Sequence, residues 1–208
     1  MEIVIASTNL HKIREIREMC KQLKNIDFLS LLNFPDYVQI EESGDTLEKN
    51  AILKAVDAAE KLNKWTIADD SGLFVPVLDG APGVRSRRYA SEDANDTENR
   101  QRLLQALEGM AEYKRSAYYE CSLVLASPEG VKKNVTGRCE GYITDTERGR
   151  NGFGYDSIFM KNEYNKTFAE LEESVKNQIS HRMKALQKLI PTLESLSLQN
   201  DQQGSNNN

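Results

Sequence analysis

Two adjacent aspartates, Asp69 and Asp70, follow a short apolar run and precede a serine and a glycine. Residues 65–68 have the composition of a β-strand, and Asp-Asp-Ser-Gly is typical of a turn that ends one. Ligands of α/β proteins bind beyond the carboxyl ends of strands. Because successive side chains of an extended segment point to opposite sides, we expect the two aspartates to have different roles. An ordinary polar turn is the competing interpretation.

A second polar turn, residues 7–12, lies between the apolar run 3–6 and a segment with helical spacing of apolar residues. A helix N-terminus offers N–H groups and the positive end of the helix dipole, which together suit a phosphate. Ser7, Thr8 and Asn9 add short hydrogen-bonding side chains, and Lys12 adds a charge. The pattern indicates either a phosphate site or an ordinary N-cap of a first helix.

An acidic turn containing Glu41 and Glu42 precedes the amphipathic pattern of residues 47–62, which Thr46 can cap. Two glutamates in a loop are usually solvated. If the fold brings one of them beside Asp70, the pair forms a hard-oxygen site, since Mg²⁺ is commonly held by one or two carboxylates and substrate phosphates.

Residues 152–156, Gly-Phe-Gly-Tyr-Asp, combine glycines that permit close approach with two rings available for stacking and a carboxylate acceptor. A glycine-rich hairpin whose rings fill the core is the alternative. Near the end of the chain, His181 and Arg182 begin a final helix capped by Ser180. His beside Arg at a helix start provides hydrogen-bond donors, although both side chains could equally be surface residues.

The chain has 208 residues and a net charge of −5, without a long basic block, which argues against a nucleic-acid groove. Three scattered cysteines suggest reduced packing residues, and no segment suits a signal peptide or a membrane span. We therefore expect a soluble, cytoplasmic protein with one domain at residues 1–194 and a polar, flexible tail at residues 195–208.

Further strands are expected at residues 26–32, 116–126 and 131–144, with a hairpin turn between the last two, and a helix is expected at residues 95–107. Strands alternating with helices and followed by a hairpin predict an α/β fold with a mixed sheet.

Six motifs follow one another along the chain: Ser7-x-Asn9-x-x-Lys12, Glu41-Glu42-x-Gly44, residues 68–73, residues 80–83, residues 152–156 and residues 179–182. Their order resembles that of the non-canonical purine NTP pyrophosphatases, the inosine triphosphatase (dITP/XTP pyrophosphatase, Ham1-like) family. The resemblance covers about residues 1–192. It implies an elongated central mixed β-sheet with flanking helices, two lobes around an active-site cleft, and a homodimer. It also implies Mg²⁺-dependent hydrolysis of ITP, dITP and XTP to the monophosphate and pyrophosphate.

The resemblance also implies roles for individual residues. Asp70 matches the general base and metal ligand, Glu41 matches a second metal ligand, and Ser71 matches a substrate contact. The phosphate-binding turn is Ser7, Thr8, Asn9, Leu10, His11 and Lys12, and the nucleoside-binding set is Phe153, Gly154, Tyr155, Asp156, Lys176, His181 and Arg182.

Base choice has a physical explanation in this set. Hypoxanthine and xanthine carry a 6-oxo acceptor where adenine has an amino donor, so donors such as His181 and Arg182 favour them. Phe153 or Tyr155 would stack on the base.

The sequence departs from the family pattern at Ser157 (usually proline), at Arg87 (usually alanine) and at Ser174 and Val175 (often acidic). None of these is a proposed catalytic residue. A metal-NTP-dependent transferase and a non-catalytic nucleotide sensor remain as alternative functions, as does a hydrolase for modified pyrimidine nucleotides.

Overall fold

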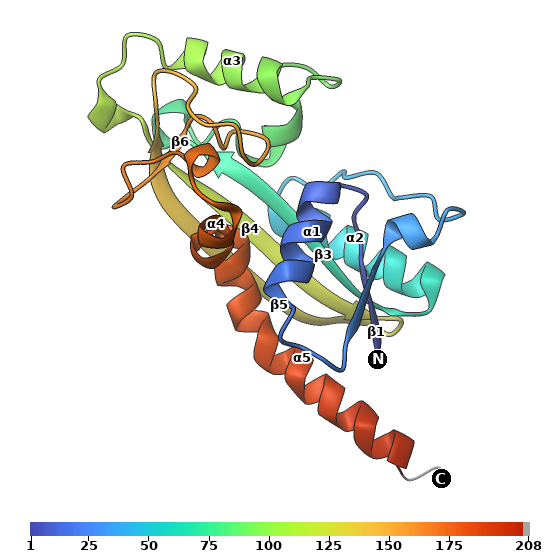
Figure 1. Cartoon of the computed structure of the whole chain (residues 1–208). Coiled ribbons are helices and arrows are strands. Elements are labelled where there is room, and N and C mark those ends of the chain that lie inside the picture. Colours follow the sequence, from blue (N-terminus) through green and yellow to red (C-terminus); the bar gives the residue numbers. More distant parts are fainter. Residues whose placement is uncertain (206–208) are drawn as a thin grey trace. The chain divides into compact units, whose positions relative to one another are not determined.

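The computed structural model describes the backbone of residues 1–205 and the side chains of residues 1–199 (Figure 1). Within these residues the strands form one six-stranded sheet with the order β2-β1-β3-β4-β5-β6. The strands are β1 (Glu2–Ile5), β2 (Asp27–Ser30), β3 (Trp65–Phe74), β4 (Ser116–Ser127), β5 (Gly130–Ile143) and β6 (Phe159–Lys161). The α-helices are α1 (Leu10–Met19), α2 (Leu47–Leu62), α3 (Asp96–Ala106), α4 (Glu173–Ile179) and α5 (His181–Ser205).

The sheet is mixed, because β1 pairs in parallel with both β2 and β3 whereas β6 pairs antiparallel with β5. The predicted α/β class is therefore confirmed. The described residues divide into two compact units. Unit 1 comprises Met1–Asp70, Ser122–Thr136 and the chain from Met183, and unit 2 comprises Ser71–Cys121 and Gly137–Arg182.

The prediction that a strand ends before Asp69 was wrong. β3 continues through both aspartates, Ser71 and Gly72 to Phe74. The two aspartates can stay in this strand because lysine side chains offset their charges. Gly72 also has a packing role, since a Cβ atom there would lie 2.4 Å from the carbonyl oxygen of Gly83.

Unit 1 has a core in which small side chains of α2 contact β-strand residues. Ala51, Ala55, Ala58 and Ala59 are buried in one cluster with members of β1, β3 and β4. Alanines on one face of a helix permit close packing without large side chains. Thr46 caps α2, as predicted, by accepting the N–H of Lys49. This packing places the neighbouring polar residues of α2 against the aspartates of β3.

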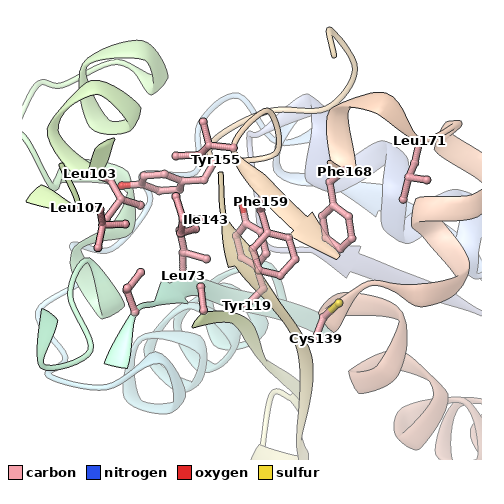
Figure 2. Packing of buried hydrophobic residues seen from close by; sticks show 13 residues of the cluster. Leu73, Leu103, Leu107, Tyr119, Cys139, Ile143, Tyr155, Phe159, Phe168 and Leu171 are labelled. Carbon is pink, nitrogen blue, oxygen red and sulfur yellow. The ribbon is translucent and has the colours of Figure 1, made fainter. Parts of the chain in front are cut away.

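Unit 2 has a core rich in aromatic rings (Figure 2). The Tyr119 ring packs edge-on against Phe159 and stacks with Phe168, at centroid separations of 4.7 and 5.9 Å. Leucines of α3 complete the same cluster. The core holds β4, β6 and the segments around them in one arrangement, which fixes the loop containing residues 152–156.

The end of the chain is helical further than its composition indicated. α5 continues to Ser205 and so includes most of the predicted tail, whose flexibility remains a prediction; residues 206–208 lie outside the described residues. The three cysteines are buried thiols, as expected. Among the described residues, no helix has the length and hydrophobicity that crossing a membrane requires.

Candidate active site

The predicted site residues fall into two groups, one in each unit. Ser7 to Lys12, Glu41 and Asp70 belong to unit 1, and the remaining residues belong to unit 2. In each group, some predicted residues form hydrogen bonds, ion pairs or ring contacts with residues that the sequence analysis did not single out.

The two aspartates of β3 have separate cationic partners. Asp69 is 3% exposed and forms an ion pair of 3.2 Å with Lys12. Asp70 is 7% exposed, and its Oδ1 lies 3.2 Å from Nζ of Lys54. The two carboxylates therefore have different ion-pair partners, and the expectation that they have different roles remains a prediction.

Lys54 is the centre of the charged group in unit 1. Besides its bond to Asp70, its ammonium donates to Glu42 Oε1 at 2.9 Å and to the carbonyl oxygen of Asp69 at 2.8 Å. All three N–H donors of the lysine are therefore used. Such a fully bonded, buried ammonium fixes the position of Asp70 and offsets its charge.

Asn50 fixes the other oxygen of the same carboxylate. Its Nδ2 donates to Asp70 Oδ2 at 3.2 Å, and its Oδ1 accepts the N–H of Gly44 at 2.7 Å. Gly44 suits this position, because a Cβ atom would lie 2.9 Å from Lys49 Cβ and 3.0 Å from the main-chain nitrogen of Asn50. Asn50 thus ties the acidic turn to the catalytic candidate.

Sequence reasoning missed both Asn50 and Lys54. A usable signal existed: they are spaced four residues apart and lie next to the buried alanines at positions 51 and 55. A polar pair at helical spacing beside an apolar stripe lies at the edge of the buried face.

The ionisation of this group reflects burial and mutual charge. Burial is the largest influence on Asp70 and raises its pKa above the ordinary value of 3.8, although Lys54 and Lys12 act to lower it. For Lys54, burial acts to lower the pKa, but Asp70, Glu42 and Asp69 together outweigh it and the pKa is raised. Lys54 is consequently a cation, and Asp70 binds a proton more readily than a solvated aspartate does.

The predicted phosphate-binding turn lies at the start of α1, whose first residues are Leu10, His11 and Lys12, but Asn9 already caps this helix. Its Oδ1 accepts the N–H groups of His11 and Lys12, at 3.0 and 3.2 Å, and Ser7 Oγ accepts the N–H of Asn9. Two N–H groups that a phosphate would use are therefore bonded within the turn. The side chains of Thr8, Leu10 and His11 are exposed and Lys12 is partly exposed, so Lys12 is the stronger anion-binding candidate.

The structure places Glu42, rather than Glu41, beside Lys54; Glu41 is exposed. The assignment of Glu41 as a metal ligand remains a prediction. Within the described residues, no three His, Cys, Asp or Glu side chains cluster as a metal site. The donor set of Asp70 and one glutamate nevertheless fits Mg²⁺, which takes few protein carboxylates when substrate phosphates supply the other oxygens.

In unit 2, Asp156 and Lys176 form a buried ion pair of 2.6 Å. Asp156 Oδ2 also accepts the N–H of Phe153 at 3.0 Å. This bond closes a turn that contains Gly154 and Tyr155. The ammonium of Lys176 lies 4.8 Å from the centre of the Phe153 ring, a cation–π distance. The half-buried Phe153 ring and a buried cation thus lie together, as a site for a polar aromatic base requires.

The position of Tyr155 corrects one expectation. Its ring is 4% exposed within the aromatic core (Figure 2), and its hydroxyl donates to the carbonyl oxygen of Ser86 at 2.7 Å. A ring so enclosed cannot stack on a substrate base. Phe153 is therefore the stacking candidate, and Tyr155 anchors the loop.

His181 and Arg182 are buried rather than surface residues. The His181 imidazole stacks on the Tyr119 ring, with centroids 4.7 Å apart and planes 10° from parallel. The Tyr119 hydroxyl also reaches Asp156 Oδ1, at 3.5 Å. Arg182 is within 3.4 Å of Ser71 Oγ. Tyr119, which the sequence did not single out, therefore contacts two predicted nucleoside-binding residues.

The family model described as the Ham1 family matches residues 3–192. A dITP/XTP pyrophosphatase of Protochlamydia amoebophila is 55% identical over 197 residues, which are 94% of this chain and 99% of that protein. A dITP/XTP pyrophosphatase of Chlamydia abortus is 52% identical over 197 residues, 94% of this chain and 96% of the relative.

A solved structure of a HAM1 protein from Coxiella burnetii is similar as well. It has a TM-score of 0.85 and 41% identity, and the match covers 94% of this chain and 99% of that one. The structure of the Staphylococcus aureus Ham1 protein has a TM-score of 0.82 and is also 41% identical in sequence. That match likewise covers 94% of this chain and 99% of the Staphylococcus aureus chain.

Proposed function

The chain belongs to the Ham1 family, and on that premise we propose that it is a nucleoside-triphosphate pyrophosphatase. It hydrolyses dITP, ITP and XTP to the nucleoside monophosphate and pyrophosphate, and so removes deaminated purine nucleotides from the nucleotide pool. The geometric observation that carries the proposal is the buried Asp70 carboxylate, bonded on one side by Asn50 and on the other by Lys54.

In the proposed mechanism, Asp70 accepts the proton of the attacking water. Its raised pKa makes it a stronger base than a solvated aspartate, and general bases work best when their pKa approaches the working pH. Lys54 and Asn50 hold the carboxylate in one orientation. Lys12 neutralises part of the charge of the triphosphate, since phosphoryl transfer depends mainly on positioning and charge neutralisation.

Mg²⁺ is part of the proposal. Asp70 would hold it together with one carboxylate of the acidic turn, and when bound it neutralises phosphate charge and orients the leaving group. Glu41 is the candidate from the family resemblance, and Glu42 is the candidate from its bond to Lys54. Glu41→Gln and Glu42→Gln separate the two: the variant with the larger rise in the Mg²⁺ concentration for half-maximal rate identifies the ligand.

Base selection is assigned to the unit 2 group. Phe153 stacks on the base, and Lys176, His181 and Arg182 donate toward the 6-oxo acceptor of hypoxanthine or xanthine. Adenine presents a donor at that position, which leaves buried donors unpaired; discrimination of this kind reaches on the order of 10⁴-fold.

The test is pyrophosphate release from ITP, XTP, ATP and GTP, with and without Mg²⁺, for wild type and Asp70→Asn. We expect metal-dependent pyrophosphate from ITP and XTP, little from ATP or GTP, and a rate about 10²–10⁴-fold lower in the variant. Pyrophosphate only when an acceptor is added would favour the transferase. Binding of ITP with no turnover would favour the sensor, and preference for modified pyrimidine triphosphates would favour the third alternative.

We further propose a cytoplasmic homodimer that binds no nucleic acid, in line with the family resemblance and the net charge of −5. Light scattering of the purified protein measures the mass directly, and a monomer at working concentration would contradict this part of the proposal.

A further inference from the structure

Side chains from the first two turns of α3 form hydrogen bonds with the main chain of the loop at residues 152–156. Asp96 Oδ2 accepts the N–H of Gly154 at 2.7 Å, and Arg100 Nη1 donates to the carbonyl oxygen of the same residue at 2.9 Å. Both main-chain groups of Gly154 are thus bonded to side chains one helical turn apart. This two-point attachment fixes the rotation of the peptide units next to Phe153.

Arg100 is itself held by three partners. Its Nε lies 2.9 Å from Glu147 Oε2, Nη1 bonds Gly154, and Nη2 lies 3.1 Å from Thr97 Oγ1. Glu147 also accepts the hydroxyl of Ser157 at 2.9 Å. A planar guanidinium can satisfy several acceptors in fixed directions, which a lysine ammonium does not match. The result is a chain of contacts, Ser157–Glu147–Arg100–Gly154, that links the middle of the loop to the residue after its C-terminal end.

The backbone conformation of Gly154 depends on these contacts, because glycine has few intrinsic constraints. Gly154 has a φ of +60°, and glycine accesses this region while remaining flexible in others. The N-terminus of α3 is well fixed, because Asn95 and Glu98 form a reciprocal capping box. A rigid helix end therefore supplies the attachment for a loop that glycine would otherwise leave mobile.

We propose that Arg100 and Asp96 are positioning residues that hold Phe153 and Asp156 in the conformation that accepts the purine base. This inference rests on the proposed function, and assigns to α3 a part in recognising the base. Neither residue touches the substrate. If the loop is released, only a fraction of molecules has the competent conformation, and the apparent affinity falls by that fraction.

The test compares Arg100→Met with Arg102→Met, which removes an equal charge from an exposed position of the same helix. We expect Arg100→Met to raise the KM for ITP about tenfold, with kcat and the inhibition constant of tripolyphosphate within about twofold of wild type. Tripolyphosphate has no base, so it reports the phosphate-binding residues alone. Arg102→Met should behave as wild type.

Hydrogen exchange gives a second measurement that needs no turnover. The amides of residues 152–157 should exchange faster in Arg100→Met and in Asp96→Ala, and at the wild-type rate in Arg102→Met and in Asp96→Asn, which keeps an acceptor oxygen. Wild-type exchange and KM in both Arg100→Met and Asp96→Ala would overturn the proposal, as would an equal weakening of tripolyphosphate. If wild type releases no pyrophosphate from ITP, the proposed function fails, whereas the exchange data still decide whether α3 orders the loop.

Discussion

The charged group of unit 1 and the loop of unit 2 hold their functional side chains by different means. In unit 1, two lysines and three carboxylates form a set of ion pairs, and burial and charge set the ionisation of Asp70 and Lys54. In unit 2, the buried ion pair of Asp156 with Lys176 lies beside the Phe153 ring, and Asp156 also accepts a main-chain N–H group.

This difference predicts different responses to mutation. Removing one charge from unit 1 changes the environment of every other member, so both chemistry and stability should suffer. Removing one contact from unit 2 changes the orientation of a loop or a ring, so binding of the base should suffer more than the rate of the chemical step. Four substitutions or measurements test this contrast.

The largest effect is expected for Lys54→Met, which removes the cation that Asp70 and Glu42 share. Loss of a buried ion-pair partner costs about 3–5 kcal/mol, and loss of one electrostatic group in a site lowers kcat about 10²–10³-fold. Urea unfolding and ITP hydrolysis measure the two quantities. Lys61→Met is the matched control, because this lysine is on the same helix, has a side chain that is 53% exposed and pairs with Asp57. Equal effects at both positions would contradict the central role of Lys54.

Lys176→Met should act mainly on KM. The change removes a charged hydrogen bond to Asp156 and a donor for the base, and bonds to charged groups contribute about 1.5–3 kcal/mol, or roughly 10- to 150-fold. Because Asp156 stays buried without this cation, the free energy of unfolding should also fall by about 3–5 kcal/mol. We expect the KM for ITP to rise within that range with kcat within about fivefold of wild type. Lys166→Met, at an exposed position of the same unit, serves as the control. A fall in kcat as large as that of Lys54→Met would remove the distinction between the two regions.

The pH dependence of stability tests the unit 1 group without turnover. Since burial raises the pKa of Asp70 above 3.8, the folded protein keeps this proton at pH values where the unfolded chain has lost it. The contribution of Asp70 to the free energy of unfolding is therefore greatest below pH 3.8 and decreases as the pH rises toward the folded-state pKa. The decrease is about 1.4 kcal/mol for each pH unit that separates the folded and unfolded pKa values.

Metal-free urea titrations at several pH values measure this contribution as the difference between Asp70→Asn and wild type. The variant should gain stability relative to wild type as the pH increases through this window. Asp36→Asn, at an exposed position, provides the comparison. A difference that is constant with pH would show that Lys54 and Lys12 fully cancel the effect of burial.

The smallest effect on KM is expected for substitutions of Tyr119, whose aromatic ring should contribute more than its hydroxyl. Tyr119→Phe keeps the stack on His181 and removes the long contact with Asp156, so the KM for ITP should change less than about twofold. Tyr119→Leu removes the stack, and aromatic pairs contribute about 0.5–1.5 kcal/mol, which corresponds to about 2- to 10-fold in KM. Equal KM values in the two variants would mean that the stack does not position His181.

The sequence by itself determined several of the elements and the chemistry of the residues. Periodicity predicted α2, α3 and the β4–β5 hairpin to within a few residues, because a repeat of apolar positions depends on local geometry alone. The Asp-Asp pair, Lys12 and the Phe-Gly-Tyr-Asp motif were recognisable as donors, acceptors and rings from their types and order.

Only the tertiary structure decided which of these groups meet. It continued β3 through the aspartates, selected Glu42 as a partner of Lys54, and enclosed Tyr155 while leaving Phe153 half-buried. It also brought Arg100 to Gly154, 54 residues away. Contacts between distant segments depend on how helices and strands pack, and one residue of shift in a strand or a half turn of a helix exchanges the buried and exposed faces. The residue types therefore follow from the sequence, whereas their partners follow from the packing.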